Sequence, residues 1–189
     1  MRIITGSARG VKLITLEGEL TRPTAERTKE AIFSMIQFDI EGRKVLDLFA
    51  GSGQLALEAL SRGATEAVVC DASKEAAEII KKNANKTRLT EKIKLHVCDS
   101  YKLIPKLGLE KFDIIFLDPP YALNLIPGAL KLLIQYNMLK PTSIIVCESA
   151  KSEDVFGGDC DLIKCFQIKK MAKYGAAFVT IMSPVEEIL

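Results

Sequence analysis

Four consecutive residues, Asp118-Pro119-Pro120-Tyr121, combine two hydrogen-bond acceptors with an aromatic ring. The prolines have no N–H donor and they stiffen the turn, so the groups left available are the Asp118 carboxylate and the Pro119 carbonyl. Tyr121 adds a flat face on which a ring can stack. Such a set can receive a planar group that carries an NH2. The alternative interpretation is a rigid structural turn that binds nothing.

This motif predicts a particular chemistry. The exocyclic amine of a nucleic-acid base is a poor nucleophile, because its lone pair is delocalised into the ring. Acceptors on both of its N–H bonds favour a pyramidal nitrogen, and the Asp118 carboxylate stabilises the positive charge that builds up when a methyl group is transferred. Because a stacked base cannot enter a pocket, we expect an unpaired or flipped-out base that stacks on Tyr121.

A second candidate site is the loop Gly51-Ser52-Gly53, which follows a strand-like apolar run and opens a helical pattern. Glycine allows a tight turn and close approach by a ligand, and the N–H groups at a helix start face that ligand. Asp71 ends the next strand-like run, where a carboxylate can accept hydrogen bonds from both hydroxyls of a ribose. Together they predict an adenosine-containing cofactor, with an empty tight turn as the alternative.

Two further aspartates favour one cofactor. Asp47 directly precedes the loop, where it would repel a pyrophosphate but attract an ammonium group by about 4 kcal/mol at contact and an effective dielectric near 20. Asp99 follows the third strand-like run and can accept from an adenine amine. The series therefore favours S-adenosyl-L-methionine over a dinucleotide. The expected cofactor site also includes the neighbours of these aspartates, Phe49, Ala50, Gly51, Gly53, Ala72 and Ser100.

The elements that position these residues alternate along the chain. Strands are predicted at 45–49, 67–71, 93–97, 112–117 and 143–147, and helices at 54–62, 74–86 and 125–136. This alternation is typical of a doubly wound α/β sheet with helices on both faces. Two later runs, 161–169 and 176–182, have too little chain between them for a crossover helix. They predict an antiparallel pair at the sheet edge.

The first 44 residues stand apart from this pattern. Residues 1–5 and 11–16 flank a glycine-containing loop, which predicts a β-hairpin, so residues 1–20 form an N-terminal extension. Thr24 can cap a helix from 25 to about 38, and residues 21–44 lead into the core. The first 16 residues carry Arg2, Arg9 and Lys12 without an acid, which indicates a basic face or an ordinary solvated surface.

Composition narrows the class of protein. The 189 residues fit one domain, 1–189, with 48% hydrophobic and 26% charged residues and a net charge of +2. No apolar run approaches the ~20 residues of a membrane helix, and no secretory signal opens the chain, so we expect a cytoplasmic protein. The five cysteines form no C-x-x-C pair and His96 is the single histidine, so no metal site is expected.

The motifs and their order resemble the bacterial 16S ribosomal RNA guanine-N2 methyltransferases. The similarity is carried by residues 1–10, Arg22-Pro23-Thr24, 30–33, 45–53, 57–64 and Asp118-Pro119-Pro120-Tyr121. It implies a Rossmann-like, seven-stranded methyltransferase sheet whose last strand is antiparallel. It also implies that Asp71 and Asp99 contact the ribose and adenine of S-adenosyl-L-methionine, with Arg22 and Thr24 near the cofactor or the base.

The resemblance further implies an enzyme that methylates the N2 amine of a guanine held by residues 118–121. Its partner would be 16S ribosomal RNA, in the small ribosomal subunit or an assembly intermediate, gripped by Arg2, Arg9 and Lys12; a monomer without metal or membrane is expected. One alternative is a DNA adenine or cytosine amino-methyltransferase, although no target-recognition domain is evident. The other is a non-catalytic RNA-binding module for ribosome assembly, which the intact motif at 118–121 disfavours.

Overall fold

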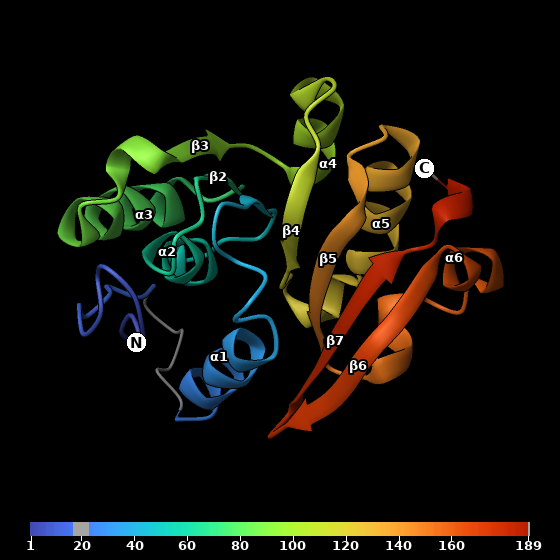
Figure 1. The fold of residues 1–189 in the computed structure, drawn as a ribbon, viewed down its shortest axis with the longest axis horizontal. Helices are drawn as coiled ribbons and strands as arrows, with labels where there is room; N and C mark the ends of the chain where they lie inside the picture. Colours follow the sequence, from blue (N-terminus) through green and yellow to red (C-terminus); the bar gives the residue numbers. More distant parts are fainter. Residues whose placement is uncertain (17–22, 189) are drawn as a thin grey trace.

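The computed structural model describes residues 1–16 and 23–188, with side chains from Glu26 onward in the second range. Its centre is a seven-stranded sheet with the order β3-β2-β1-β4-β5-β7-β6 (Figure 1). The strands are β1 (Lys44–Asp47), β2 (Glu66–Asp71), β3 (Ile93–Val97), β4 (Phe112–Leu117), β5 (Leu139–Ser149), β6 (Phe166–Tyr174) and β7 (Ala177–Pro184). β1 to β5 pair in parallel, whereas β7 is antiparallel to β5 and β6. The predicted doubly wound sheet with an antiparallel last strand is thus confirmed.

Helices cover both faces of the sheet, as Figure 1 shows. On one face lie α1 (Pro23–Met35), α2 (Gln54–Ser61) and α3 (Lys74–Thr87), and on the other lie α4 (Ser100–Leu103), α5 (Ile126–Gln135) and α6 (Cys160–Lys164). Each face has its own hydrophobic core. Every residue of β4 is buried, and all except Asp113, whose carboxylate lies 2.8 Å from Lys140, are apolar, as expected of a central parallel strand covered on both faces.

The predicted strand at 161–169 is wrong in its first half. Residues Cys160–Lys164 form the short helix α6, and the strand begins only at Phe166. The Asp159 side chain caps α6, since it accepts hydrogen bonds from the backbone N–H groups of Asp161 (3.0 Å) and Leu162 (2.9 Å). A local cap therefore outweighed the apolar run that had suggested a strand.

The strand β6 forms one edge of the sheet. Its residues from Gln167 to Met171 are exposed, and they include Lys169 and Lys170; Lys173 is exposed further along. Its inner side pairs with β7 over most of its length. This edge strand therefore exposes lysines among its apolar residues Ile168 and Met171.

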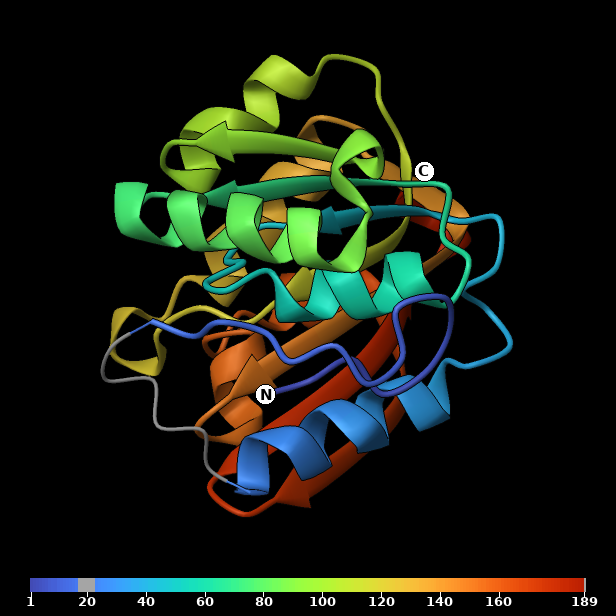
Figure 2. The same ribbon diagram turned by 90° about the vertical axis from the view of Figure 1, so that its left-hand side faces the viewer.

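The N-terminal segment, residues 1–16, forms the predicted hairpin, in which the backbone N–H groups of Ile3 and Leu13 donate to the carbonyls of Val11 and Met1 at 3.0 and 2.9 Å. Within it the structure shows a single bridge, between Arg2 and Lys12. The backbone N–H groups that would extend the pairing are used elsewhere: those of Ile4 and Thr5 donate to the Glu58 carboxylate at 2.8 and 3.1 Å. The segment therefore docks on α2 instead of forming a free hairpin, and Figure 2 shows it lying between α2 and α1.

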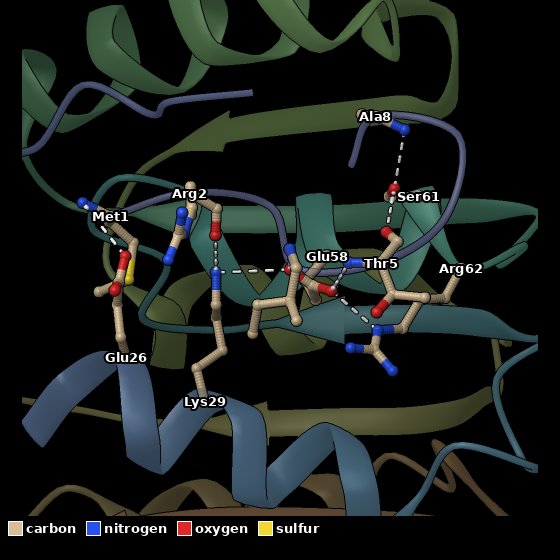
Figure 3. Close-up of polar contacts among 10 residues, drawn as sticks. Met1, Arg2, Thr5, Ala8, Glu26, Lys29, Glu58, Ser61 and Arg62 are labelled. Atoms are coloured by element: carbon tan, nitrogen blue, oxygen red, sulfur yellow. Dashed lines mark hydrogen bonds and ion pairs between the residues drawn. The ribbon is translucent and has the colours of Figure 1, made fainter. Parts of the chain in front are cut away.

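Glu58 is the centre of a buried polar network that fixes this segment (Figure 3). It is fully buried in α2, and its carboxylate lies 2.8 Å from Arg62 and 3.4 Å from the buried Lys29 of α1. Lys29 also donates to the backbone carbonyl of Arg2. Burial lowers the pKa of Lys29, and the nearby Glu58 charge opposes this. The network ties three parts of the chain together.

Gly6 lets the segment approach α2 closely. Its φ of +89° lies in the region that favours glycine, and a Cβ atom there would sit 1.8 Å from the Ser61 carbonyl oxygen. Around this point, Ser61 accepts from the backbone N–H of Ala8 at 3.0 Å and donates to the carbonyl of Thr5 at 2.6 Å. Backbone contact of this kind leaves no room for a side chain.

We predict that Glu58→Gln lowers the free energy of unfolding by about 3 kcal/mol, because it leaves the Lys29 charge buried without its partner. Urea denaturation of wild type and variant measures the difference. The control is Glu30→Gln, on an exposed side chain of α1, the helix that carries Lys29, and it should change stability by less than about 0.5 kcal/mol. Equal stability of the two variants would contradict the role of the network.

Candidate active site

A cavity of about 660 Å³ lies at the carboxyl edge of the parallel strands. It is lined by Leu16, Leu48, Phe49, Gly51, Asp71, Ala72, Asp99, Ser100, Asp118, Pro119, Pro120, Tyr121, Leu123, Leu125 and Glu148. Open α/β sheets bind ligands outside the carboxyl ends of their strands. The volume also falls within the roughly 300–1,000 Å³ typical of small-molecule sites. This cavity is therefore the candidate active site.

The cavity brings together the two motifs singled out in the sequence. The Gly51 loop and Asp71 form one part of the wall, and Asp118 to Tyr121 form another. Their strands explain this, because β1 lies between β2 and β4 in the sheet. Phe49, Ala72, Asp99 and Ser100 also line the cavity as expected. A cofactor bound at the loop and a base bound at Asp118 would share one enclosed space.

Asp71 both shapes the loop and faces the cavity. One carboxylate oxygen accepts from the backbone N–H of Gly51 at 2.8 Å, and the other accepts from that of Ser73 at 2.8 Å. A carboxylate has about four acceptor positions, so both oxygens can still accept from hydroxyl groups. The Asp99 side chain, which caps α4 at the Lys102 N–H (3.2 Å), lines the same cavity. Both residues fit the ribose and adenine contacts expected of them.

Ala50 and Gly53 support the loop from behind and are not in the cavity wall. The N–H of Ala50 donates to the Cys70 carbonyl at 3.0 Å. Gly53 precedes α2 with a φ of +77°, and a Cβ atom there would lie 3.2 Å from the Ile80 side chain. A left-handed backbone and close packing thus both favour glycine at position 53.

Asp47 lies beneath the loop instead of at the cavity. It is 1% exposed, and neither carboxylate oxygen has a partner of hydrogen-bond geometry among the described residues. Burial raises its pKa to about 7, while the backbone N–H groups of Ala56 and Phe49 oppose the shift more weakly. Contact between Asp47 and an ammonium group, as the sequence suggested, would require this carboxylate to become accessible.

The basic N-terminal residues lie outside the cavity but on a segment that leads to it. Arg2, Arg9 and Lys12 are exposed, and Leu16 lines the cavity wall. The buried Asn83 of α3 holds the segment in place, because it exchanges hydrogen bonds with the Ile14 backbone at 2.8 and 2.9 Å. Arg22 and the side chain of Thr24, also predicted near the cofactor, lie outside the described residues.

Sequence reasoning missed Glu148, which lies near the end of β5 and lines the cavity. It accepts a hydrogen bond from the Tyr121 hydroxyl at 2.6 Å. Burial raises the pKa of Glu148, and the bond from Tyr121 lowers it in part. The signal was available, since Glu148 is an acidic residue at the end of a parallel strand, as are Asp71 and Asp99.

Two other kinds of site are not found in residues 1–16 and 23–188. No three His, Cys, Asp or Glu side chains in these ranges are grouped so that they could hold a metal ion. No helix there combines the length and the apolar character needed to cross a membrane.

The strand order and the cavity place the protein in the class of Rossmann-like methyltransferase folds. The yhhF protein of Escherichia coli is a solved structure of this kind, with a TM-score of 0.83, 26% identity and coverage of 97% of each chain. YlbH of Bacillus subtilis is 38% identical over 150 residues, which cover 78% of this chain and 82% of that protein. Ribosomal RNA small subunit methyltransferase D of Haemophilus influenzae is 38% identical over 157 residues, which cover 81% of this chain and 80% of that protein.

The chain belongs to the family described as Conserved hypothetical protein 95, whose model matches residues 1–183. The family resemblance that the motifs indicated is thereby confirmed. The match covers the N-terminal segment as well as the sheet.

We predict a pH-dependent effect of Asp47→Asn on stability. Asp47 has a pKa of about 7 in the folded chain against 3.8 for an exposed group, so between these values the folded state holds a proton that the unfolded state has lost. The free energy of unfolding of the wild type therefore falls as pH rises through this window. The variant lacks this titration, so its stability relative to wild type should rise by up to about 4 kcal/mol from pH 4 to pH 8.

Urea denaturation at a series of pH values measures this difference. The control is Asp161→Asn, since that side chain is 92% exposed and its replacement leaves Asp47 buried. A difference between wild type and Asp47→Asn that stays constant with pH would contradict the burial of an uncompensated carboxylate.

Proposed function

We propose that this protein transfers a methyl group from S-adenosyl-L-methionine to the exocyclic N2 amine of a guanine in 16S ribosomal RNA. The observation that carries the proposal is the single cavity whose wall contains both Asp71 of the cofactor half and Asp118 of the amine half. The name of the Haemophilus influenzae relative supports ribosomal RNA of the small subunit as the substrate class.

The cofactor half of the cavity fits the chemical groups of S-adenosyl-L-methionine. Asp71 offers acceptors to two ribose hydroxyls, Asp99 offers one to the adenine amine, and Phe49 and Ala72 supply apolar wall. The carboxylates also suit a cationic ligand. When bound, S-adenosyl-L-methionine supplies an electrophilic methyl group on a positively charged sulfur.

The amine half orients the nucleophile. The Asp118 carboxylate and the Pro119 carbonyl accept from the two N–H bonds of the amine, which aims the nitrogen lone pair at the methyl carbon. Positive charge grows on that nitrogen during transfer, so Asp118 interacts more strongly with the transition state than with the ground state. Tyr121, which is 41% exposed, provides the face for a flipped-out base.

The N-terminal segment is the proposed grip on RNA. Arg2, Arg9 and Lys12 are exposed on a segment that the Glu58 network fixes to α2, so their charges have a defined position. The segment then leads to Leu16 in the cavity wall. Phosphate contacts from these residues would hold RNA beside the cavity without reading its sequence.

We predict that Asp118→Asn lowers the rate of methyl transfer about 100- to 1,000-fold, because the acceptor remains but its charge is lost. The assay is transfer of labelled methyl groups to small ribosomal subunits from a strain that lacks this protein. Binding of S-adenosylhomocysteine, measured by calorimetry, should stay within about twofold of wild type.

Asp161→Asn, on the exposed surface of α6, is the control and should keep full activity. Unchanged transfer by Asp118→Asn would contradict the mechanism. No incorporation by the wild type would refute the enzyme itself and favour a non-catalytic RNA-binding role. Incorporation into DNA instead would favour the amino-methyltransferase alternative.

We predict that replacing Arg2, Arg9 and Lys12 together by Ala flattens the salt dependence of RNA binding. Loss of three phosphate contacts should reduce the slope of log K against log salt by about 2. Filter binding to small-subunit RNA between low and physiological salt measures the slope. The control is Lys111→Ala, at the amino end of β4 on the opposite edge of the sheet, and a slope equal to wild type in the triple variant would rule out this grip.

A further inference from the structure

Glu148 is an acidic residue of the cavity wall that the mechanism above does not use. Its position follows from the register of the sheet: Leu117 of β4 pairs with Cys147 of the parallel strand β5. The next residues along the two strands are Asp118 and Glu148. They therefore stand side by side at the carboxyl edge, with Asp118 at the place proposed for the reacting amine.

A hydrogen bond connects Glu148 to the aromatic ring of the same motif. The Tyr121 hydroxyl donates to Oε1 of Glu148 at 2.6 Å. In the described part of the chain no hydrogen bond to the second oxygen, Oε2, is found. A carboxylate can accept at both oxygens, so Glu148 can hold the ring with one and receive a ligand donor with the other.

We propose that Glu148 accepts the N1–H of the target guanine and thereby selects guanine over other bases that carry an exocyclic amine. This inference rests on the proposed function, because it places a guanine amine at Asp118. In guanine, two ring nitrogens flank the carbon that carries the N2 amine, and one of them, N1, bears a hydrogen. A base stacked on Tyr121 would bring that edge toward the carboxylate that holds the Tyr121 hydroxyl.

The selectivity has a simple electrostatic origin. Next to the amine, adenine presents the N1 lone pair and cytosine presents the N3 lone pair, so each would face a carboxylate that can only accept. The wrong base loses a hydrogen bond and leaves two acceptors in contact. Specificity thus comes from repulsion of competitors as well as attraction of guanine. Two neighbouring strand ends would then have separate roles: Asp118 would orient the amine, and Glu148 would select guanine over the other bases.

The test uses Glu148→Gln and a substrate analogue. The methylated nucleotide is first mapped by mass spectrometry. Small-subunit RNA is then assembled by ligation with either guanine or 2-aminopurine at that nucleotide. 2-Aminopurine keeps the exocyclic amine but has an N1 acceptor where guanine has N1–H. The glutamine amide offers one donor and one acceptor, so it can pair with the analogue.

Wild type should prefer guanine over 2-aminopurine by about 10- to 100-fold in kcat/KM, the range expected for one hydrogen bond to a charged group. Glu148→Gln should lower kcat/KM for guanine by a similar factor and raise the ratio of 2-aminopurine to guanine at least tenfold. Differences in the intrinsic reactivity of the two amines cancel when this ratio is compared between the variant and wild type. Glu153→Gln, on an exposed side chain close by in sequence, should keep the wild-type ratio.

Calorimetry with S-adenosylhomocysteine shows whether the Glu148→Gln cavity is intact. An intact variant that loses rate equally on both substrates overturns the inference, because Glu148 would then only hold Tyr121. Equal rates of wild type on both substrates overturn it without any variant. Methylation mapped to another base or atom refutes the proposed function itself. Because the mapping uses wild-type protein, it gives this result before the Glu148 variant is tested.

Discussion

Acidic side chains from neighbouring strand ends converge on one cavity, and this concentration of carboxylates constrains which ligands the cavity can accept. Asp71, Asp99, Asp118 and Glu148 meet there because parallel strands all end at the same edge. Backbone N–H groups donate to Asp71, the start of α4 donates to Asp99 and the Tyr121 hydroxyl donates to Glu148. A cavity with this charge favours ligands that are cationic or rich in N–H donors, as the proposed cofactor and base are.

The N-terminal segment carries basic residues and is held in place beside the cavity. The exposed residues Arg2, Arg9 and Lys12 lie outside the acidic cavity, where under the proposed function they would contact the RNA backbone. Glu58, which is buried, sets their position through backbone N–H groups and not through their side chains. Asn83 extends this arrangement, because it bonds both the Ile14 backbone and the Ser52 carbonyl of the glycine loop. The N-terminal segment and the glycine loop thus share a support in α3.

Sequence patterns predicted the parts of the structure that depend on local spacing. Strands of continuous apolar residues, the glycine loop and the strand-end aspartates were all predictable, because parallel connectivity forces their ends together. Docking of residues 1–16 on α2 was not, since it depends on Glu58 at a distance of more than fifty residues. The burial of Asp47 was missed for the same reason: its position beneath the loop is set by tertiary packing, not by its neighbours in sequence.

The charged edge strand β6 has a consequence for how the sheet ends. A sheet edge presents unpaired backbone groups that can recruit a foreign strand and start aggregation. The exposed Lys169, Lys170 and Lys173 would have to lose water and approach any such newcomer closely. β6 thus completes the hydrogen bonding of β7, and its exposed lysines disfavour the addition of another strand at this edge of the sheet.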